Sequence, residues 1–85
     1  MKRGKAGQEV TITGIVTAAD WGEDDDIIAV TIETADEEEY LVDDTPKGEE
    51  LLELIRKNVR VKGIVENDGY GDKIISVKSY EVLDD

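Results

Sequence analysis

The sequence predicts an all-β domain with one short helix, a five-stranded Greek-key barrel in the order strand, strand, strand, helix, strand, strand. Three observations favour a closed barrel over an open sheet with a helix packed across one side. The first predicted strand is long. Gly14 and Gly63 stand in the middle of the first and fourth strands, as expected where a barrel strand coils sharply. The only helical pattern lies between the third and fourth strands, where a helix would close the bottom of the barrel.

The first three strands are predicted from alternation of apolar and polar residues. The first begins near Glu9, the second spans residues 27–34 and the third spans residues 38–42, after a turn at residues 35–37. One residue in two should point into the barrel. The expected inward set is Val10, Ile12, Val16, Ile28, Val30, Ile32, Tyr40 and Val42.

Residues 49–57 carry the helical pattern, with leucines and an isoleucine three and four positions apart. Acidic residues begin the segment and Arg56 and Lys57 end it, an order that suits the helix dipole. We expect Asn58 to end the helix in the left-handed conformation. Pro46 belongs to the preceding connector, because proline is excluded from a central strand.

The last two strands should form a hairpin around a turn at residues 67–71. Val59, Val61 and Val65 are the expected inward residues of the fourth strand. In the fifth strand, residues 73–83, the pattern changes phase: Ile75 and Val77 point one way and Tyr80 and Val82 the other. A β-bulge near Lys78 and Ser79 would return both pairs to the core.

Composition limits the function. The chain has 85 residues, so we expect residues 1–7 to be a flexible basic tail and residues 8–85 a single, monomeric domain. The sequence lacks histidine and cysteine, which removes the commonest general base, the commonest transition-metal ligand and any thiol nucleophile. No other catalytic arrangement is evident. We therefore expect neither an enzyme nor a cofactor.

The chain carries no apolar run near the ~20 residues that span a bilayer, so we expect no membrane partner. The absence of cysteine fits a reducing cytoplasm, and export with a removed signal peptide is the alternative. A detached or redesigned domain of a larger protein is also compatible with a chain that lacks histidine, cysteine and phenylalanine.

The second half of the sequence resembles a known family. A short leucine-rich helix is followed by V-x-V-x-G-x-V, a glycine-containing turn, I-x-V and a closing Tyr-x-Val. The matching residues are Val59, Val61, Gly63, Val65, Gly69, Ile75, Val77, Tyr80 and Val82. Over residues 8–83 the chain is similar to small stand-alone bacterial and archaeal oligonucleotide/oligosaccharide-binding (OB) domains, related to the anticodon-binding domains of tRNA synthetases. The resemblance implies a ligand across strands two and three, flanked by the loops that join strands one to two and four to five.

Those two loops are acidic here. Residues 20–26 and 67–72 hold the candidate ligand-binding residues Trp21, Asp24, Asp25, Asp26, Asp68, Tyr70 and Asp72. Three interpretations remain: solvated turns, which favour aspartate; a site for a basic peptide or protein, steered by the negative charge; or a calcium site, for which neither loop has the EF-hand spacing.

The formal net charge of −12 disfavours nucleic acid, because affinity for phosphates comes largely from lysine and arginine. Trp21 and Tyr70 could nevertheless stack bases, although Trp21 is expected to fold over the barrel mouth instead. A basic patch of Arg56, Lys57, Arg60 and Lys62 is expected to pair with acidic neighbours. The sequence thus predicts a non-enzymatic binding module for a basic or cationic partner, with a single-stranded nucleic-acid binder as the alternative.

Overall fold

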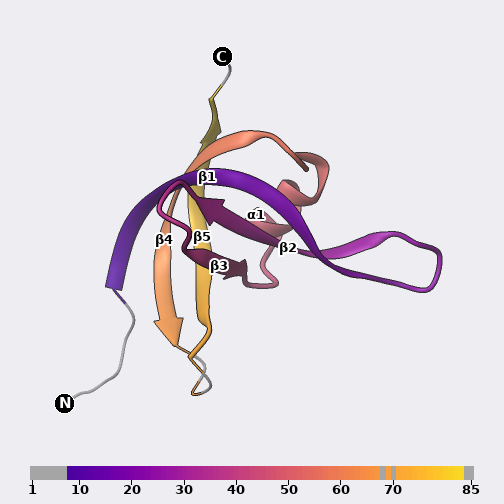
Figure 1. Cartoon of the computed structure of the whole chain (residues 1–85), viewed down its shortest axis with the longest axis horizontal. Helices are drawn as coiled ribbons and strands as arrows, with labels where there is room; N and C mark the ends of the chain where they lie inside the picture. The colour runs from indigo at the N-terminus through magenta and orange to yellow at the C-terminus, as the bar shows by residue number, and fades with distance from the viewer. Residues whose placement is uncertain (1–7, 68, 70, 84–85) are drawn as a thin grey trace.

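The computed structural model describes residues 8–67, 69 and 71–83, and its strands close into a five-stranded barrel (Figure 1). The strands follow the order β1-β2-β3-β5-β4 around the barrel, and β4 pairs with β1 to close it. All pairs are antiparallel except β3 with β5. The strands are β1 (Gln8–Trp21), β2 (Ile27–Thr34), β3 (Glu39–Val42), β4 (Asn58–Asn67) and β5 (Lys73–Val82). The predicted fold class is confirmed.

The core fills the barrel with aliphatic side chains contributed by every strand. Its fully buried members include Val16, Ile32 and Ile75. Alternation explains the pattern, because each strand sends one residue in two inward. The buried set is Ile12, Val16, Val30, Ile32, Val42, Leu51, Val59, Val61, Ile75 and Val77. Val10, Tyr40 and Val65 pack against this cluster, as the alternation predicts.

The two mid-strand glycines lie where neighbouring strands come too close for a side chain. A Cβ atom on Gly14 would stand 2.3 Å from the carbonyl oxygen of Glu33, and one on Gly63 would stand 2.3 Å from that of Ser76. Both contacts are with backbone, so a side chain could be accommodated only by moving a strand. The glycines therefore permit the close coiling that closes the barrel.

The expectation that Ile28 faces inward is wrong, since its side chain is 57% exposed. The β1–β2 ladder shifts register twice, between Ala18 and Asp20 and between Asp20 and Trp21. The second shift leaves Ile28 as an extra residue in β2, and an extra residue reverses the facing of those beyond it. Ile27 consequently packs against the core while Ile28 faces solvent.

The helical segment is shorter and earlier than residues 49–57. α1 (Pro46–Glu49) is followed by a 3₁₀ turn, η1 (Glu50–Glu53). The Thr45 hydroxyl caps α1 by accepting a hydrogen bond from the Gly48 amide, at 3.0 Å, and Leu51 is the buried anchor of η1.

Asn58 is not the helix cap, because it already belongs to β4. The left-handed residue is Arg56, with φ of 71°. Its amide donates to the carbonyl of Val16 at 2.7 Å, and the Val16 amide donates to the carbonyl of Lys57 at 3.1 Å. The middle of β1 thus supplies the hydrogen bonds that a longer helix would have made within itself.

The bulge expected in β5 is confirmed. Lys62 pairs with Ser79 and Gly63 with Val77, which leaves Lys78 as the extra residue. The bulge returns Tyr80 to the core cluster, but Val82 remains 39% exposed, so its predicted burial is wrong. The reason is that β3 pairs with β5 only from Lys73 to Ile75, and the far end of β5 is left uncovered.

Candidate binding site on the acidic β2–β3 face

Charge is divided unequally between the two halves of the chain. Residues 8–46, which form β1, β2 and β3, contain thirteen Asp and Glu residues and no Lys or Arg. Residues 47–83, which form the helical segment, β4 and β5, contain seven acidic and seven basic residues. The negative potential is therefore concentrated on the first three strands, where it can attract a positively charged partner.

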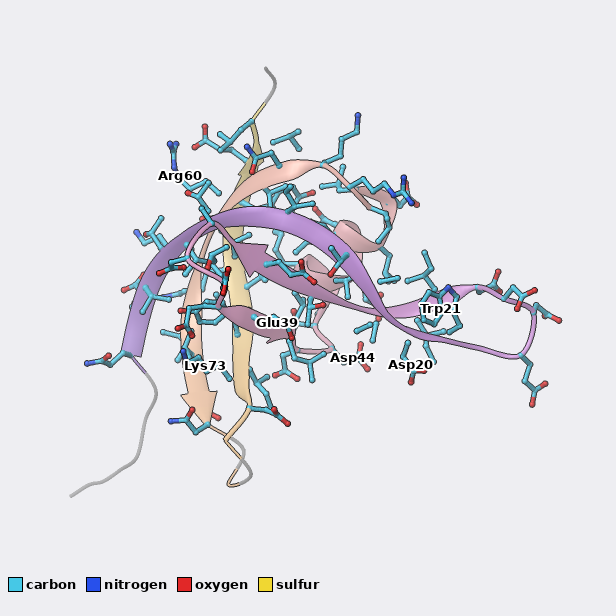
Figure 2. The ribbon with its side chains drawn as sticks, viewed as in Figure 1. Asp20, Trp21, Glu39, Asp44, Arg60 and Lys73 are labelled. Atoms are coloured by element: carbon cyan, nitrogen blue, oxygen red, sulfur yellow. The ribbon has the colours of Figure 1, made fainter. Side chains whose placement is uncertain are left out.

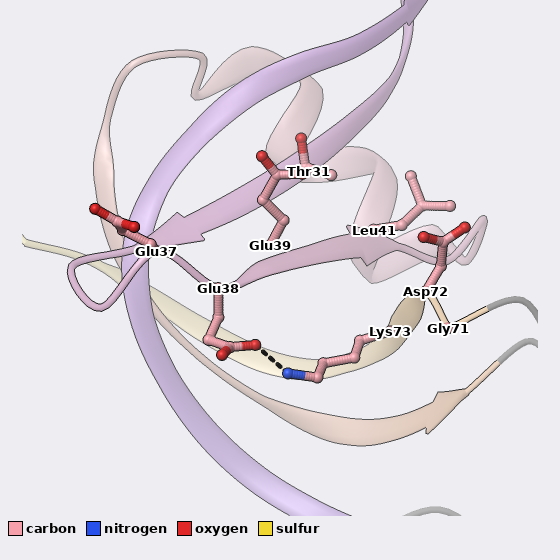
Figure 3. Close-up of a pocket in the computed structure, with 8 residues that line it drawn as sticks. All are labelled: Thr31, Glu37, Glu38, Glu39, Leu41, Gly71, Asp72 and Lys73. Carbon is pink, nitrogen blue, oxygen red and sulfur yellow. Dashed lines mark hydrogen bonds and ion pairs between the residues drawn. The ribbon is translucent and has the colours of Figure 1, made fainter.

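A depression of about 460 Å³ lies on this acidic part, over β2, β3 and the beginning of β5 (Figure 3). Carboxylates dominate its lining, and Lys73 is the only basic residue among them. The lining residues are Thr31, Glu37, Glu38, Glu39, Leu41, Gly71, Asp72 and Lys73. Its position is on the strands across which the OB resemblance implies a ligand.

Two glutamates stand opposite each other beside the depression. The β2–β3 ladder pairs Glu33 with Glu39, and like charges directly opposite in a sheet are destabilising. The hydroxyl of Thr17 donates to Glu33 at 3.4 Å, which is a long contact. Among the described residues, no Lys or Arg forms an ion pair with either glutamate. A cation bound between them would relieve the repulsion.

Lys73 is already engaged within the depression. Its ammonium group pairs with the carboxylate of Glu38 and lies 5.4 Å from the centre of the Tyr40 ring. The hydrogen bond to Glu38 raises the pKa of Lys73 above its ordinary value, so the side chain stays protonated. Figure 3 shows this pair on one side of β3 and Glu39 with Thr31 on the other. Lys73 therefore neutralises Glu38, and in the described part of the chain no ion pair compensates Glu33 or Glu39.

The loop between β1 and β2 extends from the barrel as an arm (Figure 1). Trp21 is the last residue of β1, pairs with Ile27 and is 55% exposed, so it does not cover the barrel mouth as expected. Asp24, Asp25 and Asp26 are exposed in the turn, which is closed by a 2.7 Å hydrogen bond from the Gly22 amide to the Asp26 carbonyl.

The structure does not bring the first predicted loop to those residues of the second loop that it describes. Figure 2 shows Trp21 on the arm, well apart from Lys73 and Glu39, which line the depression. Of the candidate residues in the second loop, Asp72 lines the depression, whereas Asp68 and Tyr70 lie outside the described residues. Within the described ranges, no three acidic residues are grouped so that they could hold a metal ion.

The predicted basic patch lies away from the depression. Arg60 pairs with Glu81 at 3.3 Å and Lys62 with Glu9 at 3.7 Å. Both pairs are exposed and link neighbouring strands, which is the ordinary pairing expected for these residues. Arg56 and Lys57 are exposed in the turn before β4.

Sequence reasoning missed Glu33, Glu39 and Lys73. The Glu33–Glu39 pair could have been predicted, because a hairpin turning at residues 35–37 places the residue two before the turn opposite the residue two after it.

No helix of the described residues is long and apolar enough to span a membrane. No protein-family model matches the chain, and no curated protein is significantly similar to it in sequence.

Proposed function

We propose that the chain is a non-enzymatic binding module that uses its barrel as OB domains do and takes a basic segment of a protein or peptide. The single observation that carries the proposal is the Glu33–Glu39 pair beside an acidic depression. Two facing carboxylates that have no lysine or arginine partner among the described residues destabilise the free protein. They suit a lysine ammonium or an arginine guanidinium, which would donate hydrogen bonds to both carboxylates.

The remaining acidic residues act at longer range. Charges beyond about 10 Å are largely screened at 0.1 M salt, so the exposed aspartates of the arm contribute little to a ligand held at Glu39. Their role is to raise the rate of encounter with a basic partner. Affinity is thus expected to depend on Glu33 and Glu39, and the association rate on the charge of the arm.

Neutralising the facing pair tests the proposal. The variant E33Q/E39Q should bind an arginine-rich peptide about tenfold more weakly, a difference of about 1.4 kcal/mol. Its free energy of unfolding should also rise by ~0.2–1 kcal/mol, because the cross-strand repulsion is removed. The variant should therefore unfold at a higher urea concentration. Isothermal titration calorimetry and urea unfolding measure the two effects. A substitution that weakens binding while it stabilises the fold is typical of residues retained for binding.

The matched control is E49Q/E53Q, which changes the net charge by the same amount at exposed positions of the helical segment. Equal weakening by both variants would show a nonspecific charge effect and contradict a site on the β2–β3 face. Amide shifts that map to another face on peptide addition would contradict it too.

Binding of single-stranded nucleic acid is the competing proposal, and the exposure of Trp21 favours it. Against it stands the absence of Lys and Arg from residues 8–46. Titration with oligonucleotides at low salt, followed by Trp21 fluorescence, separates the two proposals. We expect no quenching at micromolar protein, whereas saturable quenching would favour the nucleic-acid ligand.

A further inference from the structure

The outward surface of β2 continues from the glutamate pair to an apolar side chain on the arm. Glu33 and Thr31 alternate with buried Ile32 and Val30, so they face away from the core. The bulge at Ile28 adds this residue to the same outward row. Among the large hydrophobic residues of the described ranges, Ile28 is the most exposed. The row therefore has carboxylates at one end and an uncovered isoleucine at the other.

Gly22 forms the surface beside Ile28. A Cβ atom on Gly22 would lie 3.2 Å from the Ile28 Cγ2 atom, so the isoleucine lies against bare backbone and its other side is open. Asp26 adjoins this position, and its carbonyl accepts the Gly22 amide. The exposed aspartates of the arm repel acidic partners during approach, which fits a partner that carries both apolar and basic side chains.

The spacing along β2 sets the length of the partner. Glu33 and Ile28 are five residues apart in β2, and because Ile28 is the extra residue of a bulge the span lies between about 13 and 16 Å at ~3.3 Å per regular residue. An extended peptide covers nearly this distance in four residues, and the length of a basic side chain supplies the remainder. An even spacing is required, because side chains of an extended peptide alternate between its two faces.

We infer that the ligand is an extended peptide segment with a basic residue between Glu33 and Glu39 and a large aliphatic residue four positions away, packed on Ile28. The inference rests on the proposed function, which supplies the basic contact, and adds the apolar contact and the spacing. Burial of an aliphatic side chain on a half-exposed isoleucine is expected to strengthen binding about fivefold.

The test uses three synthetic nine-residue peptides of Gly, Ser, two Arg and one Leu or Ser. The first has Leu four positions after the second Arg. The second has the same composition with Leu five positions after the second Arg, and the third has Ser in place of Leu. The first should bind about fivefold more tightly than the other two. The variant I28T should remove that advantage while leaving the affinity for the third peptide unchanged.

E33Q should weaken all three peptides, and V82T, at an exposed valine far from the arm, should weaken none. If E33Q weakens binding but I28T lowers the affinity for every peptide equally or for none, the apolar contact is refuted and the proposed function stands. If no peptide binds the unmodified protein, or E33Q changes nothing, the proposed function is refuted as well. Equal affinity for the first two peptides would refute the spacing.

Discussion

At the scale of single residues, Lys73 stands out because it does within the chain what a basic ligand would do. Its ammonium group pairs with Glu38 and lies over Tyr40, inside the depression where the ligand is proposed to bind. The raised pKa means that this contribution to stability is complete below the ordinary pKa of 10.5 and is lost as the pH rises through the higher folded value. At neutral pH, Lys73 therefore keeps Glu38 neutralised and places a positive charge near Glu39 that repels a basic ligand.

Removing this charge should strengthen binding. We expect K73M to bind the arginine-rich peptide about threefold more tightly, because Glu38 becomes available and one repelling charge is lost. Calorimetry at neutral pH measures the change. The control is K62M, which removes the same charge from a pair with Glu9 outside the depression. A weaker K73M complex would instead mean that Lys73 contacts the ligand directly.

At the scale of elements, sequence patterns predicted what depends on alternation and missed what depends on neighbouring strands. Alternation placed Ile12, Val16 and Val61 correctly in the core, since it acts within one strand. The Ile28 error arose from a register shift between two strands, which the residues of one strand do not record. The helix was placed too late because the backbone of β1, distant in sequence, binds the turn at Arg56. The acidic loops stay a prediction as a binding site, whereas the Glu33–Glu39 pair follows only when the turn at residues 35–37 is used to set the register of the hairpin.

The position most tightly constrained by neighbouring strands is Gly14. G14A would place a methyl group 2.3 Å from the Glu33 carbonyl oxygen and 2.9 Å from the Ile32 side chain, so β2 must move. We expect a loss of about 1–3 kcal/mol in the free energy of unfolding, measured by urea titration. The exposed neighbour provides the control: T13A should change stability by less than about 0.5 kcal/mol. Unchanged stability of G14A would mean that the strands separate there at little cost.

At the scale of the whole molecule, the separation of charge should govern how a partner arrives. The acidic strands and their arm carry the net charge, while the acidic and basic residues of positions 47–83 are equal in number. A basic peptide approaching from solution is therefore drawn toward the first three strands before any contact forms. Association should be fast at low salt and slow as salt is added.

The arm offers a specific test of this steering. D24N/D26N removes two exposed charges from the tip and leaves Asp25, whose φ is 64°, to hold the turn. At low salt we expect the variant to associate with the basic peptide about two- to fourfold more slowly, with an unchanged dissociation rate. Near 0.5 M salt, where charges act over only a few ångströms, the association rates of the variant and the unmodified protein should converge.

Stopped-flow measurements with a labelled peptide give both the association and the dissociation rate, and E49Q/E53Q provides the control of equal charge at another position. A faster dissociation of D24N/D26N at every salt concentration would show instead that the aspartates touch the bound peptide, because a direct contact acts on the lifetime of the complex rather than on its formation.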